Sequence, residues 1–234
     1  MSGGSNISRN GDHVGALAKM LREAQIEWPP DENSYFIPVD KIRELEKKEL
    51  VREELRGIFP IMGSDELDHY VEVIRSEATK IFAVLLCSAG IQGEICKLIG
   101  EGVADSDLPL VRVHGVRKKR RSASYTLAKK EHGRCKVHGF CQVEGHAECG
   151  IKALSSWDRM EVQNLCRDQW LTLSPIFKAC PQEVPHYDFD DAVILPFIED
   201  EEKNKLLHGG YSEVWGVRIH PAHQEILISS NTSV

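Results

Sequence analysis

The chain has 234 residues, of which 41% are hydrophobic and 28% are charged, and it carries a formal net charge of −7. This composition is typical of a folded globular protein and excludes a chain that is disordered throughout. The negative charge argues against a general nucleic-acid-binding surface, so a nucleic-acid partner is not expected and any polyanion contact would have to be local.

The first residues and the apolar runs favour an intracellular protein with no membrane contact. Residues 1–11 are rich in Ser, Gly and Asn, which predicts a disordered leader without the apolar segment of a secretory signal. The longest apolar run, residues 80–91, has about half the length of a membrane span. Seven cysteines, an odd number, fit reduced thiols better than a disulfide framework. We therefore expect a cytoplasmic or nuclear location.

Two amphipathic helices are expected near the N-terminus. Apolar residues recur at helical spacing over residues 12–26, and this helix should end before Pro29 and Pro30, which cannot continue it. A second helix is expected over residues 35–59 with Asp40 as its N-cap. Its apolar side is lined by Ile42, Leu45, Leu50 and Leu55.

The strongest helix signal begins at Ser64 and continues to residue 90. Its second half contains "IFAVLLC" (residues 81–87), which is apolar on all sides and should be buried. Four glycines then leave room for only a short helix over residues 94–100. These glycines are Gly90, Gly93, Gly100 and Gly102.

A further helix is expected over residues 155–177, capped near Ser155 or Ser156. Its aromatic residues Trp157, Trp170 and Phe177 are expected in the core rather than in a ligand cage. Beyond it, "AVILPFIED" (192–200) and "EVWGVRIHP" (213–221) are strand-like runs joined by a charged, glycine-containing connection, which predicts a β-hairpin. His220 and His223 indicate a turn at the end of the second strand rather than a catalytic pair.

The expected fold class is mainly α with a small C-terminal β-hairpin. The expected domain boundaries are a disordered leader over 1–11, the first part of a helical domain over 12–114, an irregular basic and Cys/His-rich insertion over 115–150, the rest of the helical domain over 151–190, the hairpin over 191–222 and a tail over 223–234.

The glycine-containing connection follows part of the kinase glycine-loop pattern G-x-G-x-x-G-x-V. Alignment on Val214 places Gly209 at the second glycine, Ser212 at the third and Tyr211 at the aromatic tip, while Leu207 replaces the first glycine. On this pattern alone, a Gly-Gly pair between strands is first of all a turn signal.

The wider sequence carries a resemblance to a known family. The phrases "ILPFIEDEE" and "GGYSEVWGVRIHPAH" resemble the start of the kinase domain in a family of fungal protein-kinase-like proteins. Upstream, "YFIPVDKIRELEKKELVREEL", "ATKIFAVLLCSAG" and "CRDQWLTLSPIF" are similar to the helical region before that domain. The resemblance implies a helical region followed by a partial kinase N-lobe of the Ser/Thr type. It implies ATP contact through Gly209, Gly210, Tyr211, Ser212 and Val214.

Catalysis by this chain alone is not expected. The sequence contains no His-Arg-Asp, no Asp-Phe-Gly and no lysine after Lys205, whereas phosphoryl transfer requires these groups for positioning and charge neutralisation. We therefore expect at most weak ATP binding and no catalytic residue. A non-enzymatic helical module that binds an unidentified protein partner, and a zinc-stabilised binding module, are the alternatives.

The zinc alternative rests on a cluster of cysteines and histidines. Four of them could bind a tetrahedral zinc ion, but the spacing lacks the paired C-x2-C of known fingers. We favour a Cys/His-rich surface segment without metal. The residues are His132, Cys135, His138, Cys141, His146 and Cys149.

A basic run covers Arg117 to Arg121 and is followed by Ser122 and Ser124. A nuclear-import signal beside phospho-acceptor serines and an ordinary solvated loop are equal alternatives for it. Nucleic-acid binding ranks below both, because no aromatic platform adjoins the run.

Overall fold

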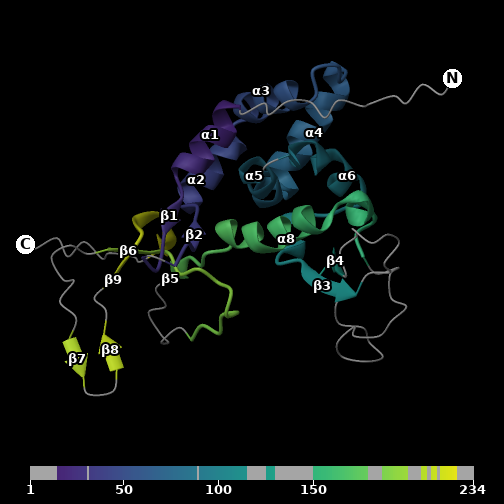
Figure 1. Cartoon of the computed structure of the whole chain (residues 1–234). Helices are drawn as coiled ribbons and strands as arrows, with labels where there is room; N and C mark the ends of the chain where they lie inside the picture. Colours follow the sequence, from purple (N-terminus) through teal and green to yellow (C-terminus); the bar gives the residue numbers. More distant parts are fainter. Residues whose placement is uncertain are drawn as a thin grey trace, which may run out of the picture.

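The structure is a computed structural model, and it describes residues 15–30, 32–88, 90–114, 125–129, 150–178, 186–199, 207–209, 212–214 and 217–225. In these residues the fold is mainly α with a small β component, as expected. Figure 1 shows a body of helices with short strand pairs toward its edges. None of the helices in these ranges is long and apolar enough to cross a membrane.

The helices lie largely in the first half of the chain. The α-helices are α1 (Ala16–Glu23), α2 (Val39–Arg43), α3 (Lys48–Ile58), α4 (Ser64–Glu77), α5 (Thr79–Cys87), α6 (Ile95–Gly100) and α8 (Arg159–Asp168). The 3-10 turns are η1 (Glu44–Glu46), η2 (Gln92–Glu94), η3 (Asp105–Asp107), η5 (Lys152–Ser156), η6 (Gln169–Thr172) and η7 (Pro221–His223).

The described strands form two-stranded ladders. The antiparallel pairs are β1 (Ile26–Glu27) with β2 (Tyr35–Phe36), β3 (Val111–His114) with β4 (Tyr125–Ala128), β6 (Phe197–Glu199) with β9 (Val217–Ile219), and β7 (Leu207–Gly209) with β8 (Ser212–Val214). The parallel pair is β5 (Phe177–Lys178) with β10 (Gln224–Glu225). Strand β4 corrects the expectation that residues 115–150 are irregular throughout.

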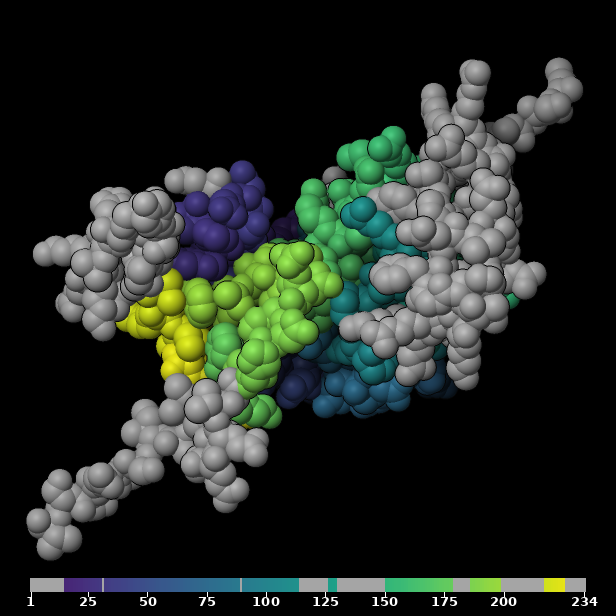
Figure 2. Space-filling view, turned by 90° about the horizontal axis from the view of Figure 1, so that it is seen from below, coloured from purple at the N-terminus to yellow at the C-terminus, as the bar shows by residue number. Residues whose placement is uncertain are grey.

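The core is built around α5. Every residue from Ile81 to Leu86 is at most 3% exposed, as expected, whereas Cys87 at the end of the run is only half-buried. Helices α1, α2, α4, α6 and α8 all contact α5, so it has neighbours on every side (Figure 1). Burial of such side chains is the dominant favourable term in folding. Figure 2 shows the outer surface, where segment 186–199 lies between the N-terminal elements and α8.

The helix expected from Ser64 to residue 90 is divided in two at Ala78, whose φ of −133° and ψ of 27° are not helical. The new N-terminus of α5 is capped by Asp105, whose carboxylate accepts hydrogen bonds from the backbone N–H of Lys80 at 2.9 Å and of Ile81 at 3.0 Å. Burial raises the pKa of the Asp105 carboxyl, although these N–H groups oppose the shift. The cap comes from a distant turn, so local sequence did not indicate it.

The segment 35–59 is also interrupted, because Lys47 has an extended ψ of 113° between η1 and α3. Pro38 is the residue before α2, and Asp40 lies in the first turn, so the expected N-cap was wrong. Leu50 is only half-buried, whereas Val51 is fully buried in its place. Because of the interruption at Lys47, Val51 rather than Leu50 lies on the buried face of α3.

Helix α8 begins later than expected. Its N-cap is Asp158, whose carboxylate accepts hydrogen bonds from the N–H groups of Met160 and Glu161. The Glu161 carboxylate in turn accepts a hydrogen bond from the Asp158 N–H at 2.7 Å. This capping box replaces the expected cap at Ser155 or Ser156. The helical conformation ends at η6, so Phe177 lies in strand β5 rather than on the helix.

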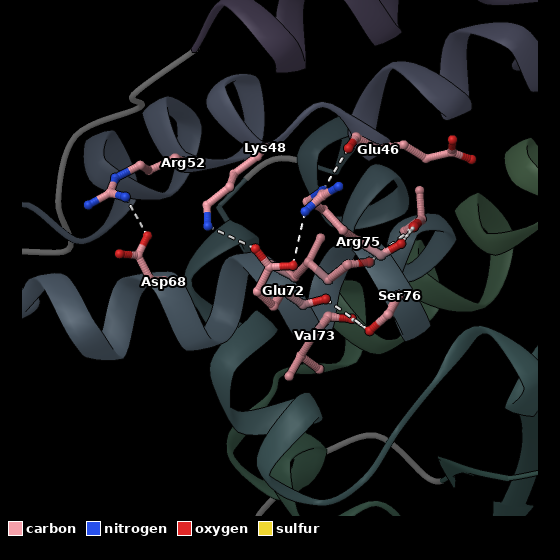
Figure 3. Close-up of polar contacts among 10 residues, drawn as sticks. Glu46, Lys48, Arg52, Asp68, Glu72, Val73, Arg75 and Ser76 are labelled. Atoms are coloured by element: carbon pink, nitrogen blue, oxygen red, sulfur yellow. Dashed lines mark hydrogen bonds and ion pairs between the residues drawn. The ribbon is translucent and has the colours of Figure 1, made fainter.

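A polar seam joins α3 to α4 on the surface (Figure 3). Lys48 forms an ion pair with Glu72 at 2.9 Å, and Arg52 contacts Asp68. The Arg75 Nε donates a hydrogen bond to the Glu46 carbonyl at 2.6 Å. These side chains are exposed or partly exposed, so each pair contributes little to stability.

Candidate functional site

The glycine hairpin consists of the β7–β8 ladder. Gly209 pairs with Ser212, and Leu207 pairs with Val214, at opposite ends of the ladder. Gly210 and Tyr211, the remaining predicted nucleotide contacts, lie outside the described residues. Leu207, which replaces the first glycine of the pattern, is therefore a strand residue opposite Val214.

The hairpin is nested inside a second ladder. Strand β6 pairs with β9, so that Phe197 lies opposite Ile219 and Glu199 lies opposite Val217. Residues 200–206 separate β6 from β7, whereas only residues 215 and 216 separate β8 from β9. The two strand-like runs therefore pair through β6 and β9, as expected, and the residues on either side of Gly210 and Tyr211 form the additional ladder β7–β8.

The outer ladder is fixed to the helical body by His223, which is 1% exposed. Its Nε2 accepts a hydrogen bond from the Val39 N–H at 3.0 Å, at the start of α2. Its Nδ1 lies 2.9 Å from the Pro175 carbonyl oxygen and must donate, because a carbonyl can only accept. The ring is thus held neutral with its proton on Nδ1.

His220 completes this attachment. Its Nδ1 accepts a hydrogen bond from the Ala222 N–H at 3.2 Å and closes the turn η7, which agrees with the predicted turn at the end of a strand. Phe36 packs edge-on against His220 and His223, with ring centroids 6.2 Å and 5.6 Å away. Burial lowers the pKa of both imidazoles, most directly for the enclosed His223. The two histidines therefore have structural roles in the described residues.

A second candidate site is an open cleft of about 840 Å³ between the N-terminal elements, the end of α8 and segment 191–195. Figure 2 shows these three parts meeting on one face. Its aromatic lining comes from Trp28, Tyr35 and Trp170, and its apolar lining includes Leu171 and Ile194. Trp170 is half-buried and lines this cleft, whereas Trp157, at 6% exposed, belongs to the core as predicted.

The polar lining of the cleft is organised around Asp168. One carboxylate oxygen accepts a hydrogen bond from the Ser88 hydroxyl at 2.7 Å, and the other accepts from the Arg167 Nε at 2.7 Å. Asp168 also raises the pKa of Arg167, as expected for a cation beside a carboxylate. At the base of the cleft, burial raises the pKa of the Cys87 thiol to about 11, so this thiol stays protonated at neutral pH. The cleft is thus suited to binding rather than to thiolate chemistry.

Two other predicted features fall outside the described residues. These are the Cys/His cluster, with Cys135, His138, Cys141, His146 and Cys149, and the basic run Arg117 to Arg121. Among the residues that are described, no group of three or more His, Cys, Asp or Glu side chains is placed to hold a metal ion. The expectations for the cluster and for the basic run stay predictions.

Comparison of the chain with models of protein families, with curated proteins and with solved structures finds no match.

The cleft was not found by sequence analysis, because four separate segments form it. Trp28 precedes Pro29 in a segment where the sequence only indicated a helix end, and Trp170 was assigned to the core. Only the pair Arg167–Asp168 next to Trp170 offered a local signal. A charged pair beside an aromatic residue is too common on helices to identify a site.

Proposed function

We propose that this chain joins a helical region to the opening glycine hairpin of a protein-kinase-like N-lobe, and that the hairpin contacts ATP weakly. The nested antiparallel ladders carry this proposal, because they place Gly209 directly opposite Ser212 in the β7–β8 pair. The anchoring of β9 by His223 supports the assignment of the helical region and the hairpin to one unit.

The ladder supports the proposed ATP contacts. Gly209 has no side chain, so a phosphate could approach its backbone closely, and Ser212 lies directly opposite. We assign Gly209, Gly210, Ser212 and Val214 to the lining of the nucleotide, with Tyr211 over the phosphates. Leu207, the bulky residue at the first glycine position, pairs with Val214 in the same ladder, which agrees with weak rather than tight binding.

Phosphotransfer is not part of the proposal. The 234 residues include neither a His-Arg-Asp nor an Asp-Phe-Gly sequence, and no lysine follows Lys205. In kinases these groups hold the phosphates and magnesium and accept the proton of the substrate hydroxyl. We therefore assign no catalytic residue and expect no kinase activity from these residues alone.

Thermal unfolding with and without ATP tests the proposal. A ligand that binds only the folded state raises stability by roughly 1.4 kcal/mol at ten times its Kd. In a chain of this size we expect the Tm to rise by about 3–5 °C. The double substitution Gly209→Val, Gly210→Val should remove this rise, because it places branched side chains where the phosphates approach.

Gly93→Val is the matched control, because a Cβ at Gly93 would meet no atom within 4 Å. This variant should keep the full response to ATP. The absence of any ATP response in the wild-type chain, or an unchanged response in the double variant, would contradict the proposal.

The open cleft favours a second candidate, a helical module that binds another protein. Its volume lies within the range of natural ligand sites, and its lining combines aromatic and charged side chains. This function needs no nucleotide. A wild-type chain that binds a protein ligand through the cleft but ignores ATP would favour it over the first candidate.

A further inference from the structure

One wall of the cleft is unusually acidic. Residues 186–199 contain Asp188, Asp190, Asp191 and Glu199 but no lysine or arginine. Residues 186–192 are exposed, and residues 191–195 line the cleft. This wall therefore offers negative charge to solvent directly beside the opening.

The same wall carries exposed aromatic rings. Tyr187 and Phe189 are 38% and 37% exposed, and their rings stack with centroids 5.5 Å apart and an interplanar angle of 12°. Phe177 packs edge-on against both rings, which holds them in place. Rigid, exposed aromatic faces beside carboxylates attract cations through their negative π-faces.

Two cations near this wall are already paired with carboxylates. Arg167 is bound to Asp168, and Lys178 forms an ion pair with Glu225 at 3.3 Å. By contrast, the carboxylates of Glu32, Asp188 and Asp191 make no hydrogen bond or ion pair with any residue in the described ranges, and Glu32 and Asp191 line the cleft. The local balance is negative, which disfavours a phosphate ligand and favours a cationic one.

We propose that this cleft binds a basic peptide segment of a partner protein. One Lys or Arg side chain would lie between Glu32 and Asp191, with its alkyl stem against Trp170. A neighbouring cation would lie on the rings of Tyr187 and Phe189. The proposal is independent of the nucleotide assignment, because the cleft shares none of the residues assigned to ATP.

A labelled peptide with the sequence VRKKRRSAS, which is that of residues 116–124, serves as the basic probe in fluorescence anisotropy. We expect the double substitution Glu32→Gln, Asp191→Asn to weaken binding about tenfold, because it removes both unpaired carboxylates of the lining. Binding should also weaken as salt rises, since the charges are exposed. A peptide in which glutamine replaces every Lys and Arg should not bind.

The double substitution Glu49→Gln, Glu53→Gln is the matched control. It makes the same change in net charge at exposed positions of α3, away from the cleft, and should leave the affinity within about twofold of wild type. Equal weakening in both double variants would indicate attraction by the net charge alone and overturn the proposal.

A further variant separates the partner from the chain's own basic run. It replaces the five residues Arg117 to Arg121 with glutamine. Probe binding that is seen only in this variant would identify the chain's own run as the occupant and overturn the assignment to a partner. The proposal also fails if the probe binds neither the wild type nor this variant, or if the cleft variant binds as tightly as wild type.

Discussion

Helix α5 and the C-terminal segment 217–225 are held in the protein by different kinds of contact. Six consecutive residues of α5 are buried by apolar neighbours on all sides. Segment 217–225 is instead attached through the buried ring of His223, which links Val39 and Pro175, and through short strand pairs. Apolar burial tolerates small shifts, whereas a bridge of two hydrogen bonds depends on one residue and one protonation state.

The difference implies two levels of stability. Loss of packing around α5 should unfold the whole helical body, because α1, α2, α4, α6 and α8 contact α5 directly and α3 packs on α1 and α4. Loss of the His223 bridge should release the C-terminal ladder and its glycine hairpin while the helices stay folded. Four experiments, from the largest expected effect to the smallest, test this separation.

Phe82→Ala should have the largest effect. Phe82 is fully buried in α5, and truncation of such a side chain leaves a cavity that lowers the free energy of unfolding by about 3–5 kcal/mol. Urea unfolding followed by circular dichroism measures this loss. Met160→Ala, at a residue 63% exposed, should change stability by less than about 0.5 kcal/mol. Similar values for the two variants would contradict the central role of α5.

His223→Leu should have the next largest effect, and it should be local. The substitution leaves the Val39 N–H and the Pro175 carbonyl without their partner, which costs about 1–3 kcal/mol for each group. Hydrogen exchange should accelerate at Val39 and in segment 217–225 but not in α5. His69→Leu, at an exposed histidine, is the control. Faster exchange throughout α5 in His223→Leu would show that the two regions unfold together.

Acidification should act on the same attachment. Burial lowers the folded-state pKa of His223 below 6.5, so the unfolded state binds more protons as the pH falls past that value. The stability supplied by the neutral ring is complete above pH 6.5. It declines at lower pH by up to about 1.4 kcal/mol per pH unit. Unfolding measured between pH 7.5 and 5.5 should show this slope in wild type and less of it in His223→Leu, while equal slopes would contradict the role of His223.

Lys48→Gln should have the smallest effect. The Lys48–Glu72 pair on the surface seam is exposed, so its loss should lower the free energy of unfolding less than any of the three preceding changes. A double-mutant cycle with Glu72→Gln isolates the coupling between the two side chains. A coupling as large as the loss caused by His223→Leu would contradict this ranking and place the seam on the same level as the His223 bridge.

The two regions also differ in how much of their structure could be predicted from the sequence. The burial of residues 81–86 follows from their composition, and the C-terminal hairpin follows from two strand-like runs around glycines. The break at Ala78 was missed because its cap, Asp105, lies 27 residues later in the chain. Contacts of this kind depend on the tertiary fold and leave no local pattern.

The cap of α1 shows the same limit. The Glu54 carboxylate, on α3, accepts a hydrogen bond from the Leu17 N–H at 3.1 Å. A Cβ at Gly15 would lie 2.0 Å from that carboxylate, so this glycine allows a close approach that no turn pattern indicated. The same limit applies to the two candidate sites. The glycine hairpin is formed by neighbouring residues and was predicted, whereas the cleft is assembled from distant segments and was not.

Hydrogen exchange of the wild-type chain with and without saturating ATP tests the central functional claim most directly. The account predicts slower exchange across residues 207–214 in the presence of ATP, with no change in α5. It also predicts no change in the cleft wall at residues 191–195. Unchanged exchange over 207–214, or protection confined to the cleft wall, would contradict the assignment of the glycine hairpin as the site of ATP contact.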